Sequence, residues 1–193
     1  MSVPVEKREG KYTYKDLCSW PENERWELID GEAYDMTPPP STSHQRILNK
    51  LSFIVQSFLE GKPCEMFFAP FGVFFPKTDE PDDEIDTVVE PDLVVICDKN
   101  KINKKGCRGA PDWVVEILSP STRRKDLIKK TTLYETHGVK EYWVIYPDEK
   151  IIQVYELEGK KEYDQKRLYI GLAKAPVAVL PGLEIDLQKI FQD

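Results

Sequence analysis

The 193-residue sequence predicts one α/β domain with a mixed sheet, a β-hairpin near its N-terminus and a β-rich C-terminal part. Three observations predict it. The runs LVVIC, WVVEIL and YWVIY have the length of strands and are apolar on both faces, which indicates a sheet covered by helices on both sides. Two predicted helices lie before and between these runs, and the first has apolar residues at helical spacing. The composition, 40% hydrophobic and 32% charged, is that of a globular chain.

Residues 1–40 predict a short helix and a hairpin. Thr13 can cap a helix that runs to Trp20, where a proline ends it. The alternating segment RWELIDGEAYDM surrounds Asp30-Gly31, a dipeptide that favours a two-residue hairpin turn. A run of three prolines, 38–40, stops the second strand.

Residues 41–147 hold the predicted core. A long helix starts at Ser41 or Ser43 and ends before Gly61. A strand pair interrupted at Pro70, an exposed acidic loop and one apolar strand, VVEPDLVVIC, come next. A lysine-rich loop, the strand WVVEIL, a helix that ends near His137 and the strand EYWVIY complete the order helix, strand, strand, strand, helix, strand. Residues 148–193 alternate as a meander.

Charge and hydropathy exclude some classes of protein. The net charge of −7 argues against generic duplex binding. No apolar run approaches the ~20 residues of a membrane span, and the N-terminus has no apolar signal region. We therefore expect a cytoplasmic protein with no membrane contact and with four reduced cysteines.

The average charge hides two blocks of opposite sign. Residues 77–98 contain one base and nine acids, a net of −8, and residues 99–130 contain ten bases and three acids, a net of +7. An acidic site followed by a basic rim favours a local, salt-sensitive contact with a phosphodiester.

Two carboxylates stand where a buried strand should be apolar. Glu116 lies inside WVVEIL, and Asp92 begins DLVVI. A buried, unpaired carboxylate costs several kcal/mol, so each must be neutralised, paired or bound to a cation. If the two strands are neighbours, Asp92 and Glu116 converge. The alternative is that Glu116 faces solvent or pairs with an arginine inside the fold.

The helix after Glu116 supplies basic groups. Asp126, Lys130 and Tyr134 recur at a spacing of four and share one face, although such a pattern is also ordinary surface decoration. Positive charge in a first helical turn opposes the helix dipole unless an anion docks there. The first turn therefore predicts a phosphate-binding group. Its members are Arg123, Arg124 and Lys125.

The sequence closely resembles the Uma2 family, formerly DUF820, over nearly its whole length. The resemblance rests on WELIDGE, on residues 36–44, on EPDLVV, on VVEILSPSTRRKDLIKKTTLYETHGVKEYWVIYP and on PGLEIDL. This family is placed in the PD-(D/E)xK nuclease superfamily. The resemblance implies a restriction-endonuclease-like αβββαβ core and a metal-dependent endonuclease that acts on DNA, with a homodimer to address two strands.

The resemblance also implies which residues of this sequence form the active site, position by position. The resemblance assigns the two metal-binding acids to Asp92 and Glu116, which with a backbone carbonyl near Ile117 would hold Mg²⁺ or Mn²⁺. The superfamily's lysine, two residues after the second acid, is absent, because Leu118 stands there. The family assigns that role to Lys130, which would orient or deprotonate the attacking water.

Auxiliary positions and other functions stay open. His44 at a helix start either contacts substrate or serves as a capping or packing residue, and Glu27 either joins the site or faces solvent. Glu90 is expected on the same strand face as Asp92, where it could join a second metal site. We expect Tyr134 to pack. We expect the aromatic cluster to form core or dimer contacts and not a base-stacking surface; its members are Phe67, Phe68, Phe71, Phe74 and Phe75. Leu118 motivates an alternative function, a non-catalytic nucleic-acid-binding or assembly module. A third possibility is a different hydrolytic substrate, such as a nucleotide or a modified end, at the same metal site.

Overall fold

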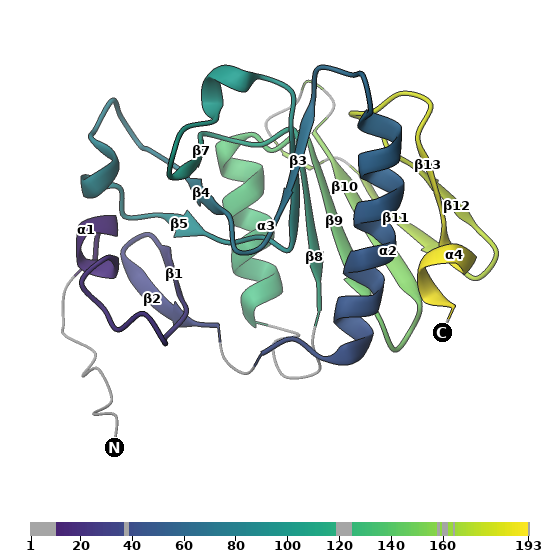
Figure 1. Cartoon of the computed structure of the whole chain (residues 1–193), viewed down its shortest axis with the longest axis horizontal. Coiled ribbons are helices and arrows are strands. Elements are labelled where there is room, and N and C mark those ends of the chain that lie inside the picture. The colour runs from purple at the N-terminus through teal and green to yellow at the C-terminus, as the bar shows by residue number, and fades with distance from the viewer. Residues whose placement is uncertain are drawn as a thin grey trace.

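The computed structural model describes residues 11–36, 39–118, 125–157, 159, 162–163 and 165–192. The chain forms a mixed α/β fold around a six-stranded sheet of order β11-β10-β9-β8-β6-β3, so the predicted fold class is confirmed. A smaller sheet has the order β2-β1-β5-β4-β7, and β12 pairs with β13 (Figure 1). The strands of the large sheet are β3 (Glu65–Phe68), β6 (Leu93–Ile96), β8 (Trp113–Ile117), β9 (Glu141–Tyr146), β10 (Ile151–Glu156) and β11 (Gln165–Ile170).

The remaining elements complete the two smaller sheets and the helices. The strands of the small sheets are β1 (Trp26–Ile29), β2 (Glu32–Asp35), β4 (Gly72–Phe74), β5 (Val88–Val89), β7 (Gly106–Arg108), β12 (Lys174–Pro176) and β13 (Glu184–Asp186). The helices are α1 (Tyr14–Leu17), α2 (Thr42–Leu59), α3 (Lys125–His137) and α4 (Leu187–Phe191), with the short 3-10 turns η1 (Asp82–Glu84) and η2 (Lys99–Lys101). Within the described ranges no helix has the length and apolar character needed to cross a membrane.

The N-terminal hairpin forms as predicted. Strands β1 and β2 pair with Ile29 opposite Glu32, which leaves Asp30 and Gly31 as a two-residue turn. Both turn residues have positive φ, 51° and 80°, the conformation for which Asp-Gly is favoured. A Cβ on Gly31 would meet the Cβ of Lys11 at 2.7 Å, so the turn also needs a residue without a side chain. Helix α1 is shorter than expected and ends at Leu17.

Helix α2 covers one face of the large sheet and α3 covers the other (Figure 1). The Ser41 side chain caps α2 by accepting a hydrogen bond from the His44 amide at 3.2 Å. The buried side of α2 packs on Trp113, Val115 and Trp143. On the opposite face, Val114 and Val144 pack with the Tyr134 ring of α3 and with the small sheet. Alternation along β8 therefore points Glu116 towards α3, together with Val114 and Leu118.

The predicted strand VVEPDLVVIC is wrong as a single element. It forms two strands in different sheets, because β5 ends at Val89 in the small sheet and β6 begins at Leu93 in the large one. Pro91 lies in the link, where a residue without an amide donor cannot join a ladder. Glu90 precedes that proline outside any strand, so it does not share a strand face with Asp92.

The lysine-rich loop contains a strand that the sequence did not predict. Strand β7 pairs in parallel with β4, and Gly72 lies opposite Gly106. A Cβ on Gly106 would lie 2.0 Å from the Gly72 carbonyl oxygen, so the two backbones approach closely because position 106 is glycine.

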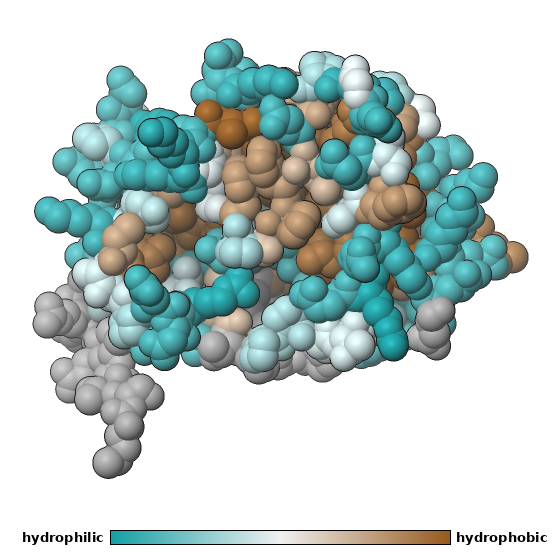
Figure 2. Space-filling model, viewed as in Figure 1, coloured by the Kyte–Doolittle hydropathy of each residue, from teal (hydrophilic) through white to brown (hydrophobic). Residues whose placement is uncertain are grey.

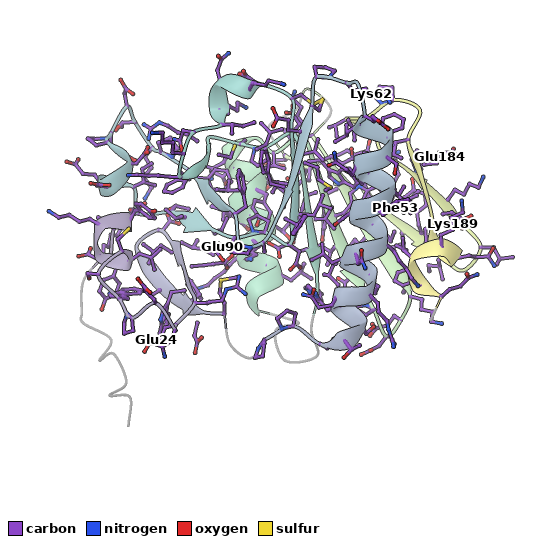
Figure 3. The ribbon with its side chains drawn as sticks, viewed as in Figure 1. Glu24, Phe53, Lys62, Glu90, Glu184 and Lys189 are labelled. Carbon is purple, nitrogen blue, oxygen red and sulfur yellow. A yellow bond between two sulfur atoms is a disulfide. The ribbon has the colours of Figure 1, made fainter. Side chains whose placement is uncertain are left out.

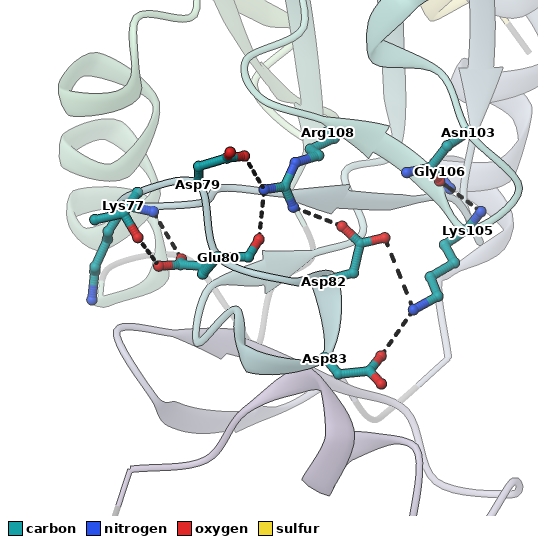
Figure 4. Close-up of polar contacts among 10 residues, drawn as sticks. Lys77, Asp79, Glu80, Asp82, Asp83, Asn103, Lys105, Gly106 and Arg108 are labelled. Atoms are coloured by element: carbon teal, nitrogen blue, oxygen red, sulfur yellow. Dashed lines mark hydrogen bonds and ion pairs between the residues drawn. The ribbon is translucent and has the colours of Figure 1, made fainter.

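The same loop pairs with the acidic loop, which changes the meaning of the charge blocks (Figure 4). Arg108 forms an ion pair with Asp82 at 2.7 Å, and Lys105 forms one with Asp83 at 2.9 Å. The lysine loop therefore balances local acids, and the described part of it is not a basic rim of the predicted metal site.

The expectation of four reduced thiols is wrong for one pair. Cys64 and Cys97 form a disulfide, whereas Cys18 and Cys107 are free. The reason is the register of β3 and β6, in which Glu65 lies opposite Ile96, so the residues just beyond that pair face each other. A separation of 33 residues gives no sign of this contact in the sequence.

Candidate active site

The two acids predicted to hold a metal lie on neighbouring strands. Strands β6 and β8 are antiparallel with Leu93 opposite Val115, and continuing this register brings Asp92 opposite Glu116. Oδ2 of Asp92 accepts a hydrogen bond from the Ile117 amide at 2.7 Å, which ties this carboxylate to the strand that carries Glu116. Both side chains line one cleft.

Helix α3 adds an ammonium group and a hydroxyl group to Glu116. Lys130 Nζ lies 2.9 Å from Oε1 of Glu116, and the Tyr134 hydroxyl donates to the same oxygen at 2.7 Å. The two residues are four apart, so they project from one face of α3. Tyr134 packs in the core, as predicted, and also hydrogen-bonds to the site.

Glu27 reaches the same ammonium group from the small sheet. Its Oε1 accepts from Lys130 Nζ at 3.0 Å and from the Glu90 amide at 2.8 Å. Glu27 is 4% exposed and therefore does not face solvent. Three elements, β1, β8 and α3, thus fix the position of the Lys130 side chain.

His44, in the first turn of α2, lies against Asp92. Its Nε2 is 3.0 Å from Oδ1 of Asp92, and its ring is buried. The helix cap is Ser41, so His44 is not the capping side chain. Its Nδ1 is buried and has no hydrogen-bond partner among the described residues.

Burial and charge together set the protonation states of the site. Burial, together with the nearby carboxylates of Asp92 and Glu27, raises the pKa of Glu116 to about 7, although Lys130 opposes this shift. Burial alone would lower the pKa of Lys130, but the carboxylates of Glu116 and Glu27 outweigh it and raise that pKa above its ordinary value. Burial also raises the pKa of Tyr134. Lys130 is therefore a cation and Tyr134 a neutral donor at neutral pH.

The cleft that contains these groups has a volume of about 710 Å³. The N-terminal hairpin forms one of its walls, and the start of α2 together with the end of β3 forms another. Cations line it in addition to the predicted groups. Residues along these walls include Arg25, Tyr34, Met36, Gln45, Arg46, Asn49, Phe68 and Lys129.

The other predicted residues are not all in the centre of this site. Glu90 lines the cleft, and Arg25 binds its carboxylate at 2.7 Å. Leu118 also lines the cleft while packing in the core beside α3, so this position holds no charge. The phosphate-binding group predicted at residues 123–125 lies outside the described side chains, as does the side chain of Asp126.

The donor set suits a hard divalent cation. Oε2 of Glu116 has no hydrogen bond within the described part of the chain, so it is free to ligate, and Asp92 supplies a second carboxylate on the adjacent strand. No group of three or more histidine, cysteine or acidic side chains with metal-binding geometry occurs among the residues described. Two carboxylates with water ligands suit Mg²⁺, which keeps much of its hydration shell.

Some parts of the site were missed from the sequence. Arg46, Gln45 and Asn49 line the cleft, but an exposed helix face gave no chemical reason to select them. Phe68 also lines the cleft, whereas the sequence favoured a core or dimer contact for the aromatic cluster to which it belongs. The spacing of His44 and Gln45 from Ser41 was the one available signal, because it puts both in the first turn of α2.

The fold and the site are those of a restriction-endonuclease-like α/β protein: two antiparallel strands bring two acids opposite each other, a helix covers each face of the sheet, and a lysine binds one of the acids, Glu116. The chain belongs to the Uma2 family, described as "Putative restriction endonuclease", which matches residues 12–188. A crystal structure from Anabaena variabilis ATCC 29413, described as "a putative nuclease belonging to DUF820", has a TM-score of 0.74 and 22% identity. The match covers 93% of this chain and 97% of that one. The comparison with curated proteins found no match.

Proposed function

We propose that this protein is a divalent-metal-dependent endonuclease that hydrolyses phosphodiester bonds in DNA. One observation carries the proposal: Lys130 Nζ lies 2.9 Å from Glu116, whose strand neighbour contributes Asp92, and all three line the same cleft. A pair of acids and a cation in one cleft is what metal-assisted attack on a phosphodiester needs. The family description supports the reaction class.

Asp92 and Glu116 would hold Mg²⁺ or Mn²⁺ through carboxylate oxygens. A bound ion of this kind polarises the scissile phosphate and lowers the pKa of a water. The hydrogen bond from the Ile117 amide and the contact with His44 fix the Asp92 carboxylate, while Tyr134 and Lys130 fix the orientation of Glu116.

Lys130 would orient the attacking water and offset the negative charge that develops on the phosphate. The two carboxylates that raise its pKa keep it protonated, so the side chain acts through its charge and its hydrogen bonds and not as a free base. Glu27 and Glu116 hold the ammonium group from two sides. A preorganised cation needs no rearrangement when charge develops.

Arg46 is the residue best suited to hold the DNA backbone. It lines the cleft and has no ion pair within the described residues, whereas Arg25 is paired with Glu90. A cation such as Arg46, without an ion pair in the described part of the chain, fits local, salt-sensitive binding by an acidic protein. Cleavage of both strands by one such site per chain takes two chains, so a homodimer is part of the proposal, and sedimentation velocity tests it.

Plasmid cleavage tests the function. Supercoiled DNA is incubated with the protein in Mg²⁺, in Mn²⁺ and in EDTA, beside Asp92→Ala and Glu116→Ala. Glu184→Ala is the matched control, because this exposed acid on β13 lies outside the cleft (Figure 3). We expect metal-dependent nicking by the wild type and the control only. Cutting that survives in both site variants would contradict the proposal, and tight DNA binding without cutting would favour the non-catalytic module.

A further inference from the structure

An aromatic ring stands beside the predicted metal-binding acid. Phe68 ends β3, lines the cleft and is 55% exposed, so much of its ring is left uncovered by the rest of the described protein. Its strand partner is Leu93, the neighbour of Asp92. The Ala69 amide donates to the Asp92 carbonyl at 3.2 Å, so the segment that carries the ring is tied to the segment that carries the acid.

Two side-chain amides line the same cleft. Gln45 and Asn49 are four residues apart on α2, so they share one side of the helix, and both line the cleft with Phe68. Neither amide has a hydrogen-bond partner in the portion of the chain described. Each offers an N–H donor and a carbonyl acceptor to a bound molecule.

We infer that Phe68, Gln45 and Asn49 form a subsite for an unpaired nucleobase next to the phosphodiester that is cut. This inference rests on the proposed function and names its substrate class, a nucleic acid strand with at least one base out of the stack. An exposed ring provides a stacking surface for any base, and the amides match the donor and acceptor groups of a base edge. A base paired within a duplex presents no free face to such a ring.

The dimensions and surroundings of the cleft agree with this ligand. A cleft of about 710 Å³ is in the range that holds a molecule of nucleotide size. Apolar side chains gather over β3 on the face seen in Figure 2, whereas the surrounding surface is hydrophilic. The backbone hydrogen bond from Ala69 to Asp92 holds the end of β3 beside the Asp92 segment, so a base stacked on Phe68 would belong to a nucleotide near the reacting phosphate.

Binding without cleavage tests the subsite. A fluorescein-labelled 12-nucleotide single strand, an abasic strand of the same length and a matched duplex are titrated in EDTA, with anisotropy as the readout. The variants are Phe68→Ala, Phe68→Leu and Phe68→Trp. The matched control is Phe53→Ala, because Phe53 is 73% exposed half-way along α2 and is not among the residues that line the cleft (Figure 3).

We expect Phe68→Ala and Phe68→Leu to weaken single-strand binding by about ten-fold, the size of one lost base–aromatic stack. Phe68→Trp and Phe53→Ala should bind as the wild type does. The abasic strand should bind all variants equally, because it has no base to stack. Three results would overturn the inference. Phe68→Ala could lose affinity equally for the single strand, the abasic strand and the duplex, or it could bind the single strand as tightly as the wild type does. The third such result is that the wild type binds no single strand measurably.

Two further comparisons identify the class of nucleic acid that binds and distinguish failure of the subsite from failure of the nuclease function. An RNA strand of the same sequence distinguishes ribose from deoxyribose as the source of the base, and Gln45→Ala with Asn49→Ala should change the preference among homopolymers. If single-strand binding depends on the Phe68 ring but the protein never cuts plasmid DNA, the nuclease function is overturned and the subsite stands. Metal-dependent cutting with ring-independent binding would overturn the subsite and leave the function.

Discussion

Lys130 lies on a helix, yet its Nζ is 2.9 Å from the carboxylate of Glu116 on strand β8. The strand position two residues beyond Glu116 holds Leu118, which packs with the core. An ammonium group is therefore present at the acids although its usual strand position is apolar. The cation comes from α3 because that helix packs on the face towards which Glu116 points.

Replacement of Lys130 by methionine should abolish cleavage while preserving metal binding. The expected loss is at least about 100-fold in rate, because a positioned cation that orients the attacking water and offsets the developing negative charge is removed. Mn²⁺ should bind as tightly or more tightly, since the competing ammonium is gone. Lys140→Met is the control, as Lys140 pairs with Asp112 outside the cleft. Loss of metal binding in Lys130→Met would count against this role.

Glu27→Gln should lower the cleavage rate by about ten-fold, because one of the two carboxylates that hold Lys130 becomes neutral. The effect should appear in kcat, and the affinity for Mn²⁺ should change by less than about two-fold. Glu24→Gln, in which the altered acid binds the Trp26 indole and not Lys130, provides the control. A parallel fall in metal affinity would make Glu27 a metal ligand instead.

Arg46→Ala should weaken binding of DNA and reduce its salt dependence. Removing one phosphate contact lowers the slope of log K against log salt by about 1. The control is Lys174→Ala, which removes one surface charge on β12, outside the cleft. Fluorescence anisotropy between 50 and 200 mM salt, roughly the range over which such contacts are lost, measures both slopes. Equal slopes for the two variants would contradict the assignment.

The stability of the protein should depend on the ionisation of Glu141. Burial raises its pKa to about 7 from an ordinary value of 4.5, although hydrogen bonds from Val179 and Trp143 oppose the shift. The folded state keeps the proton between these two pKa values and the unfolded state loses it. The contribution of Glu141 to stability is therefore complete below pH 4.5 and lost as the pH rises through 7.

Comparison with Glu141→Gln isolates this group, because the amide does not titrate. The free energy of unfolding of the wild type, relative to the variant, should fall by about 2 to 3 kcal/mol between the two pKa values. Urea denaturation of both proteins at pH values on either side of this window measures the difference. A difference that stays constant across the window would contradict the raised pKa.

Local patterns predicted most of the fold. The Asp30-Gly31 turn, the apolar face of α2 and the buried strand β8 each depend on residues close in sequence. The split between β5 and β6 was missed, because the apolar pattern continues on both sides of Pro91 while the partner strands differ. Strand β7 was missed because its partner, β4, lies far away in the sequence, so no local pattern indicates the pairing.

The sequence predicted those site residues whose charge is unexpected in a buried strand. Asp92 and Glu116 were noticeable as acids in apolar strands, and the structure brings them together. Glu27 was left open, because a hairpin acid gives no sign of whether its face is covered, and the cover comes from α3, about a hundred residues later. Phe68 and Arg46 could be assigned to the site only from the structure, which shows that both line the cleft.

Isothermal titration calorimetry with Mn²⁺ tests the proposed metal centre most directly. Titrations of the folded wild type, Asp92→Asn and Glu116→Gln are compared, with circular dichroism to check the fold of each. We expect saturable binding to the wild type at millimolar Mn²⁺ or below and none to either variant. A folded wild type that binds no Mn²⁺, or variants that bind it as the wild type does, would contradict the assignment of Asp92 and Glu116 as metal ligands.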